Sequence, residues 1–309
     1  MASVIRSVAL RRPAFAHGLC AAAASALLAL LAAAAAPAAA QRFEQGLLWR
    51  VESQGVPPSH VFGTVHVEDP RLARLPPAAA RALEQARSLA VELGLTPANL
   101  QALAASMVLQ DGRDLPAIAG AELFARAAAA AAGIGLPEPV LRLFKPWAVA
   151  LLLMAPRQNP ENVLDYVLVR LAVERGLPVH ELESVDEQIA VFDGMAEPDQ
   201  VALLGRAVRE HERLPRTLGR IVAAYLARDL AAMWRIGQED AGEDAQARRL
   251  NEVFVQRVLE ARNARLAERI EARLKEGGAF IAVGALHLYG ERGVLALLER
   301  RGWRVMRVY

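Results

Sequence analysis

The sequence has almost no cysteine, with a single thiol among 309 residues. That thiol, Cys20, lies within the first forty residues, so a chain shortened by that segment holds no thiol at all. A disulfide framework, a thiolate metal ligand and a cysteine nucleophile are then excluded. Such a chain depends on its hydrophobic core alone for stability, even in an oxidising compartment.

The sequence also lacks an excess of charge of either sign. It has 36 basic and 34 acidic residues, a net charge of +2. Residues 1–40 contain three arginines and no acidic residue, so the remainder has 33 basic (36 − 3) and 34 acidic residues, a net charge of −1. Because nucleic-acid binding depends on basic surface, we expect no nucleic-acid partner.

Several common catalytic and nucleotide-binding motifs are missing from the sequence. There is no Gly-x-Ser-x-Gly elbow and no phosphate-binding Walker loop. The stretch His211-Glu212-Arg213-Leu214-Pro215 lacks the second histidine of a zinc-protease helix. Gly133-Ile134-Gly135 lacks the third glycine of a dinucleotide-binding turn.

The amino terminus has the pattern of a targeting segment. Arg6, Arg11 and Arg12 precede an uncharged run over 18–40, rich in Ala and Leu, that closes on Pro37-Ala38-Ala39-Ala40. This pattern predicts a secretory signal peptide over 1–40 and a periplasmic or secreted protein without a stable membrane anchor after cleavage. The alternative is an uncleaved anchor, for which the run is long enough, although alanine contributes little to membrane insertion.

What remains predicts an α/β fold with one unusual repetition. A hairpin of strands over 47–52 and 60–66 is followed by a helix over 76–86 and a strand over 88–93. At the other end, a strand over 279–285 precedes a helix over 291–301 and a strand over 303–308. Each half therefore reads strand, Gly-x-x-His, helix, strand. We expect a split mixed β-sheet built from these two units, with a large helical insertion between them.

The middle of the chain carries helix formers with apolar residues three and four positions apart. The predicted helices cover 98–110, 120–132, 139–154, 161–175, 184–194, 198–213, 216–236 and 245–276. One short strand over 177–182 interrupts them. We expect a single domain over 41–309, with sheet-forming parts at 45–95, 177–183 and 278–309 and a helical part at 96–276.

The two Gly-x-x-His stretches, Gly63-Thr64-Val65-His66 and Gly284-Ala285-Leu286-His287, are the main functional clue. Each places a histidine at the end of an apolar strand, where α/β proteins build their sites. His66 and His287 could therefore meet, and imidazole is the commonest metal ligand in proteins. The alternative is that each is an ordinary strand-end histidine bonded to a neighbour.

Glu92 is the third candidate, since it follows apolar residues at a strand end and needs a partner if it is buried. That partner is either a divalent metal or an arginine. Two histidines and one carboxylate provide three ligands and leave a position for water.

Glu183 and Arg262 are secondary candidates. Glu183 follows the internal strand, where it is either a site acid or a carboxylate at a helix start. Arg262 and Asn263 fall in the middle of a predicted helix, and composition alone favours solvent exposure for them.

Together these stretches resemble the TraB/GumN family, the bacterial relatives of the Tiki metalloproteases. The resemblance rests on an ordered set of short motifs that spans the chain after residue 40. They are Val61-Phe62-Gly63-Thr64-Val65-His66 with Asp69-Pro70, Val91-Glu92, Lys145-Pro146-Trp147, Leu182-Glu183-Ser184 with Glu187-Gln188, Arg262-Asn263, and Val283-Gly284-Ala285-Leu286-His287-Leu288 with Gly290 and Gly293.

The resemblance implies that His66, Glu92 and His287 hold a divalent metal ion, with Glu183 and Arg262 as further site residues. It implies a metal-dependent hydrolase acting on a peptide or small-molecule substrate, with manganese, cobalt, zinc or iron as the ion. Glu183, or Glu92 if it is not a ligand, would take a proton from water, and Arg262 would stabilise an oxyanion or hold a carboxylate. The alternatives are a non-catalytic protein of the same fold that binds metal or haem iron, and a scaffold with a degenerate site.

Overall fold

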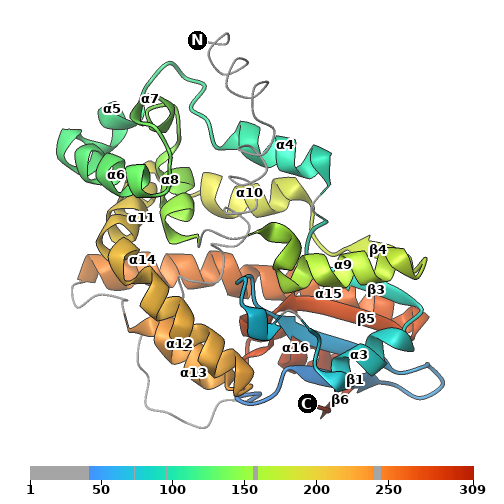
Figure 1. Ribbon diagram of the computed structural model, residues 1–309. Coiled ribbons are helices and arrows are strands. Elements are labelled where there is room, and N and C mark those ends of the chain that lie inside the picture. Colours follow the sequence, from blue (N-terminus) through green and yellow to red (C-terminus); the bar gives the residue numbers. More distant parts are fainter. Residues whose placement is uncertain (1–41, 73, 95, 156–158, 240–244) are drawn as a thin grey trace. The chain divides into compact units, whose positions relative to one another are not determined.

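The computed structural model describes residues 42–309 except 73, 95, 156–158 and 240–244. These residues form two compact units (Figure 1). A helical unit comprises the described residues of Leu95–Pro160 and Val185–Pro215. A sheet unit comprises those up to Gly94 and those of Glu161–Ser184 and Arg216–Tyr309. The predicted signal peptide lies outside the described residues.

The sheet unit is built on one six-stranded sheet with the order β4-β3-β5-β2-β1-β6. Its strands are β1 (Leu48–Glu52), β2 (Ser59–Thr64), β3 (Ser88–Val91), β4 (Val179–Glu181), β5 (Ala279–Gly284) and β6 (Arg304–Arg307). Strands β4, β3, β5 and β2 run parallel, whereas β1 pairs antiparallel with both β2 and β6. The mixed α/β fold predicted from the sequence is confirmed.

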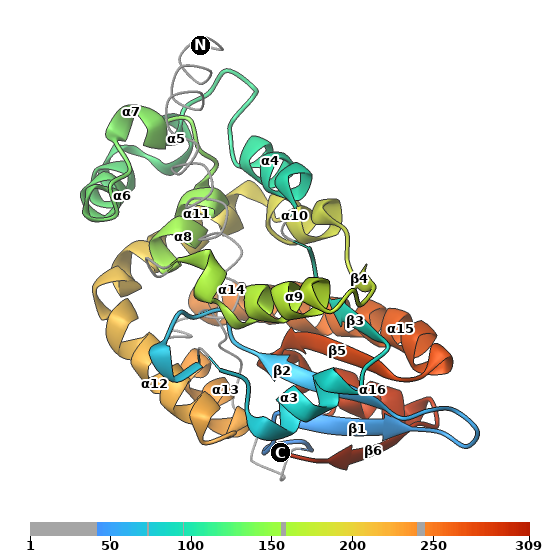
Figure 2. The ribbon, with the colours of Figure 1, turned by 45° about the vertical axis from the view of Figure 1, so that its right-hand side comes forward.

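The two Gly-x-x-His strands are direct neighbours in this sheet. Strand β5 lies between β2 and β3, with Gly63 opposite Val283 and Thr64 opposite Gly284 (Figure 2). Every residue of β5 is buried, which explains its uninterrupted apolar sequence. The two sequence repeats therefore interleave in one sheet, and their histidines leave the same edge of it.

Helices cover both faces of the sheet, as expected for parallel strands joined by crossovers (Figures 1 and 2). Helices α3 and α9 lie on one face, and α15 and α16 lie on the other. The helices of this unit are α3 (Pro77–Glu84), α9 (Leu164–Glu174), α12 (Leu214–Leu226), α13 (Leu230–Gln238), α14 (Ala245–Val255), α15 (Ala261–Glu276) and α16 (Val294–Arg300). A π-helical turn (Gln256–Glu260) joins α14 to α15, and a 3₁₀ helix (Ala285–Leu288) follows β5.

The helical unit packs around one fully apolar helix. Its helices are α4 (Pro97–Ser106), α5 (Leu115–Ala119), α6 (Ala121–Gly133), α7 (Glu138–Leu141), α8 (Pro146–Met154), α10 (Val185–Asp193) and α11 (Glu197–Glu210). All nine residues of α8 are buried, and α11 packs against it. Trp147 of α8 stacks on Phe192 of α10 with ring centroids 5.9 Å apart.

Two of the long helices predicted from the sequence are divided in the structure. The helix expected over 216–236 is interrupted between α12 and α13, where Arg228 has a φ of 61° and Asp229 caps α13 through Ala232 N–H. The helix expected over 139–154 is divided before Pro146, which fits only the first turn of α8. Within the described residues, no helix is both long enough and apolar enough to span a membrane.

Gly63 permits the close contact between the two Gly-x-x-His turns. A Cβ atom at this position would lie 3.0 Å from Ala285 Cα and 3.0 Å from Leu288 Cδ1. We expect Gly63→Ala to lower the free energy of unfolding by about 1–3 kcal/mol through overpacking, as measured by urea denaturation. The matched control is Gly219→Ala in α12, where an added Cβ meets nothing within 4 Å and we expect a gain of about 0.5–1 kcal/mol. Effects of the same sign at both glycines would contradict this explanation.

Candidate functional site

The candidate residues of the sheet unit follow the carboxyl ends of four adjacent parallel strands. In sheet order these are Glu183 after β4, Glu92 after β3, His287 after β5 and His66 after β2. The strand pairing continues past β3 and β4, since Glu183 N–H donates to the Glu92 carbonyl at 2.8 Å. This edge of a parallel sheet is where α/β proteins place their sites.

Arg262 reaches this edge from α15 and joins the two glutamates. Its Nη2 donates to Glu92 Oε2 at 2.5 Å and to Glu183 Oε2 at 2.6 Å. Its Nε donates to both oxygens of Glu183, at 3.1 and 3.0 Å, and Nη1 donates to the Val258 carbonyl in the π-helical turn at 3.3 Å. Arg262 is completely buried, so the solvent exposure that composition favours for this residue is wrong.

Glu92 is the carboxylate that this network presents to the histidines. Its Oε1 accepts from Gly284 N–H at 2.6 Å and lies 3.6 Å from His287 Nε2. Burial by itself would raise the pKa of Glu92, but the Arg262 guanidinium, the two imidazoles and the Gly284 N–H together lower that pKa. Of the two partners expected for this carboxylate, the structure shows the arginine.

His287 is held by Asn263, the residue after Arg262. His287 Nδ1 lies 2.6 Å from Asn263 Oδ1, and Asn263 Nδ2 donates to the Arg292 carbonyl at 2.9 Å. Burial lowers the pKa of His287 to about 3, and the charge of Glu92 offsets only part of that effect. The imidazole is therefore neutral, which is the form that binds metals.

His66 is held by Asp165, which the sequence analysis did not single out. His66 Nδ1 lies 2.7 Å from Asp165 Oδ2, and Thr64 Oγ1 donates to Asp165 Oδ1 at 2.8 Å. Burial alone would lower the pKa of His66, but the charge and hydrogen bond of Asp165 raise it above the usual value. His66 also lies close enough to Glu92 and His287 to interact with both electrostatically.

The distances allow a test of how well these groups fit a metal ion. Two tetrahedral ligands about 2.1 Å from one ion lie about 3.4 Å apart. The 3.6 Å between His287 Nε2 and Glu92 Oε1 is close to that value and too long for a hydrogen bond. In the part of the chain that the structure describes, no three His, Cys, Asp or Glu side chains are arranged as ligands of one ion. The pair formed by His287 and Glu92 thus has the spacing of two ligands of one ion, and His66 is their electrostatic neighbour.

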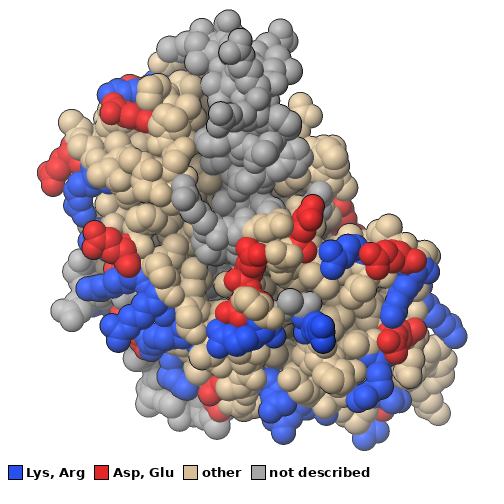
Figure 3. Space-filling model, in the orientation of Figure 1, with Lys and Arg blue, Asp and Glu red and all other residues tan. Residues whose placement is uncertain are grey.

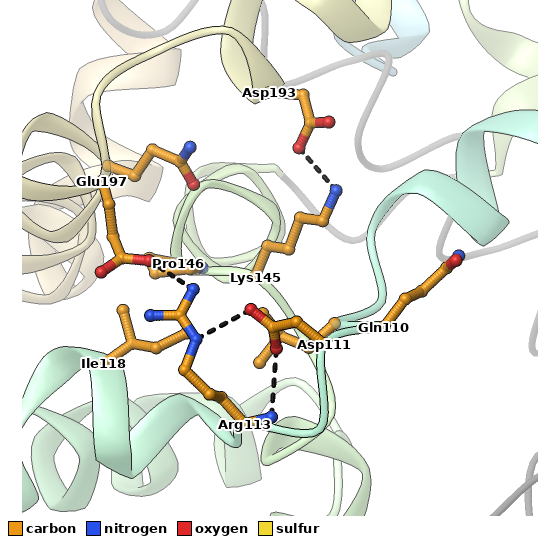
Figure 4. Close-up of a pocket in the computed structure, with 10 residues that line it drawn as sticks. Gln110, Asp111, Arg113, Ile118, Lys145, Pro146, Asp193 and Glu197 are labelled. Carbon is orange, nitrogen blue, oxygen red and sulfur yellow. Dashed lines mark hydrogen bonds and ion pairs between the residues drawn. The ribbon is translucent and has the colours of Figure 1, made fainter.

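A separate hollow of about 430 Å³ lies in the helical unit, next to the Lys145-Pro146-Trp147 motif (Figure 4). Lys145 Nζ and Trp147 Nε1 both donate to Asp193 Oδ1, at 2.6 and 2.9 Å. Arg113, on the opposite side of the hollow, pairs with Asp111 and Glu197. Both basic side chains of this lining are thus paired with its three acidic ones, and the motif contributes to the packing of α8 and α10.

Surface charge is mixed over the described residues of the face drawn in Figure 3. Basic and acidic side chains lie side by side there. Exposed ion pairs such as Arg301 with Glu271 and Arg292 with Glu260 show the same mixture of charge. The absence of a nucleic-acid partner stays a prediction.

The chain belongs to the TraB/PrgY/gumN family, whose sequence profile matches residues 47–307 and thus residues of both units. It is 24% identical over 320 residues to a metalloprotease TIKI2 of Danio rerio, covering 86% of this chain and 61% of that protein. It is also 24% identical over 323 residues to the human metalloprotease TIKI1, covering 84% of this chain and 61% of that protein. The chain thus spans about three fifths of the length of these relatives.

A bacterial relative covers a larger share of its own length. The uncharacterized protein YbaP of Shigella flexneri is 24% identical over 252 residues, covering 78% of this chain and 88% of that protein. No solved structure matches this chain.

Proposed function

We propose that this protein is a periplasmic or secreted metal-dependent hydrolase of the metallopeptidase type. One observation carries the proposal: His287 Nε2 and Glu92 Oε1 face each other at 3.6 Å, beyond hydrogen-bonding distance, in a buried part of the sheet edge. The named metalloprotease relatives support the same reaction class. The substrate is a peptide, or a small molecule with a comparable bond.

His66, Glu92 and His287 would hold the divalent ion, which can be manganese, cobalt, zinc or iron since two imidazoles and a carboxylate suit all four. The ion supplies Lewis acidity and a water molecule of lowered pKa. The hydrogen bonds of Asn263 and Asp165 occupy Nδ1 of each imidazole and so direct Nε2 to the ion.

Arg262 and Glu183 position Glu92 in this proposal. Glu183 is buried and accepts three hydrogen bonds from Arg262. Its carboxylate oxygens are therefore used in binding the guanidinium. A carboxylate held in this way fixes the guanidinium, which in turn fixes Glu92 Oε2. We therefore assign Glu183 a positioning role in place of that of proton acceptor.

The proposal is tested by metal analysis of protein purified without an affinity tag, followed by peptide cleavage assays. We expect about one divalent ion per chain, cleavage that stops with a chelator, and recovery when one of the four ions is returned. Equal cleavage rates with and without chelator would remove the mechanism.

A second candidate is a scaffold with a degenerate site, favoured by the fact that Arg262 already neutralises Glu92. The same experiment separates the candidates. A protein that binds no metal and cleaves no peptide would be the scaffold. A protein that binds metal but cleaves no peptide would be a metal-binding protein.

A further inference from the structure

Asp165 lies in the first turn of α9, and this helix begins at the same edge of the sheet as the site. Its two oxygens accept from two residues of one stretch, Thr64 at the end of β2 and His66 two residues later. A carboxylate bonded through both oxygens has a fixed plane, so the ring of His66 is fixed as well.

The bond also decides which ring nitrogen of His66 holds the lone pair when the ring is neutral. A carboxylate without a proton only accepts hydrogen bonds, so Nδ1 of the neutral ring carries the hydrogen and Nε2 carries the lone pair. The same arrangement is reached independently at His287. There the amide of Asn263 is oriented by its bond to the Arg292 carbonyl, so that Oδ1 faces His287 Nδ1.

The two supports differ in charge, because Asp165 is a carboxylate and Asn263 is a neutral amide. A carboxylate bonded to Nδ1 makes the imidazole a stronger electron donor through Nε2 than an amide does. His287 and Glu92 already lie at the spacing of two ligands, so the tautomer and the electron density of His66 matter most for completing the proposed set.

We propose that Asp165 is the positioning residue that holds His66 in the tautomer whose Nε2 lone pair can bind a metal ion. Asp165 thereby sets the metal affinity of the site. This inference rests on the proposed function, since it concerns the same ion. It adds a residue from α9 to a site otherwise built from strand ends and α15.

The test compares Asp165→Asn and Asp165→Ala with the matched control Asp186→Asn, an exposed aspartate that also lies in the first turn of a helix. Co²⁺ binding is measured by visible absorption. We expect both Asp165 variants to weaken Co²⁺ binding by about 10- to 100-fold and Asp186→Asn to leave it unchanged. Wild-type affinity in Asp165→Asn would overturn the proposal.

Imidazole ¹⁵N spectra of the metal-free protein provide a readout that a purely structural role would not change. At a pH above the raised pKa of His66, we expect the neutral ring to carry its hydrogen on Nδ1 in the wild type and to be a mixture of tautomers in Asp165→Ala, while His287 keeps its tautomer in both. A wild-type His66 with its hydrogen on Nε2 would overturn the proposal. A wild-type protein that binds no Co²⁺ would overturn the proposed function instead, and the ¹⁵N spectra would then decide the role of Asp165 without metal. Urea denaturation of each variant confirms that the compared proteins are folded.

Discussion

Replacing Arg262 by methionine is expected to destabilise the protein by about 3–5 kcal/mol, one of the largest losses that a single substitution produces. The guanidinium is completely buried and joins two buried carboxylates, Glu92 and Glu183. Methionine fills a similar volume, but it removes the cation that both carboxylates share, in a place where water cannot replace it, and leaves Glu183 the longer pair with Arg265 at 3.5 Å. The free energy of unfolding from urea denaturation at neutral pH measures the loss.

The matched control is Arg301→Met, since Arg301 pairs with Glu271 at 2.8 Å but is 37% exposed. An exposed pair contributes about 0–1 kcal/mol, so we expect this variant to remain close to the wild type. The triple variant Glu92→Gln, Glu183→Gln, Arg262→Met is expected to recover part of the loss because it removes the uncompensated charges. Equal losses for Arg262→Met and Arg301→Met would show that the buried network does not stabilise the fold.

Replacing His287 by alanine is expected to remove the bound metal and with it the peptide cleavage. His287 Nε2 and Glu92 Oε1 are the two atoms already at the separation of ligands that share an ion, so loss of either removes half of the preformed site. We expect a loss of metal affinity and of kcat/KM greater than the about 10- to 100-fold typical of residues that only support a ligand. Metal content after dialysis and cleavage of a fluorogenic peptide are the two measurements.

His60→Ala is the control for this experiment. His60 lies on β2, the strand that leads to His66, but it is opposite Phe280 near the start of β5 and so far from the carboxyl edge. We expect wild-type metal content and activity from this variant. Metal retained at the wild-type level in His287→Ala would remove His287 from the ligand set, provided that the variant unfolds at a wild-type urea concentration.

The positions of the strand-end candidates could be predicted from the sequence because they depend on local patterns. An apolar run that ends in Gly-x-x-His identifies a buried strand and the residue at its end, whatever the order of the strands. These two ends and those of β3 and β4 then lie together because parallel strands share one edge. That the roles of His66, Glu92 and His287 are those of ligands stays a prediction, as does the single domain over 41–309.

The side chains that come from helices could not be found in the same way. Arg262 lies in a helix rich in Arg and Glu, and nothing in its spacing distinguishes a buried arginine from its exposed neighbours. Asp165 occupies the first turn of α9, where an acidic residue is common for reasons unrelated to any site. Arg262 is a candidate only through the family resemblance, and its burial, like the role of Asp165, becomes evident when tertiary structure brings α15 and α9 to the carboxyl edge of the sheet.

The insertion of β5 between β2 and β3 also has a consequence for synthesis on the ribosome. Until residues 279–284 have emerged, β2 and β3 cannot acquire the neighbour that lies between them, and each leaves a row of backbone groups unsatisfied. The nascent polypeptide thus carries two unpaired strand edges while the residues between β3 and β5 are made. Because Ser88 must then pair with Ala279 and His60 with Phe280, closure of the sheet is slow and the waiting edges are open to other chains.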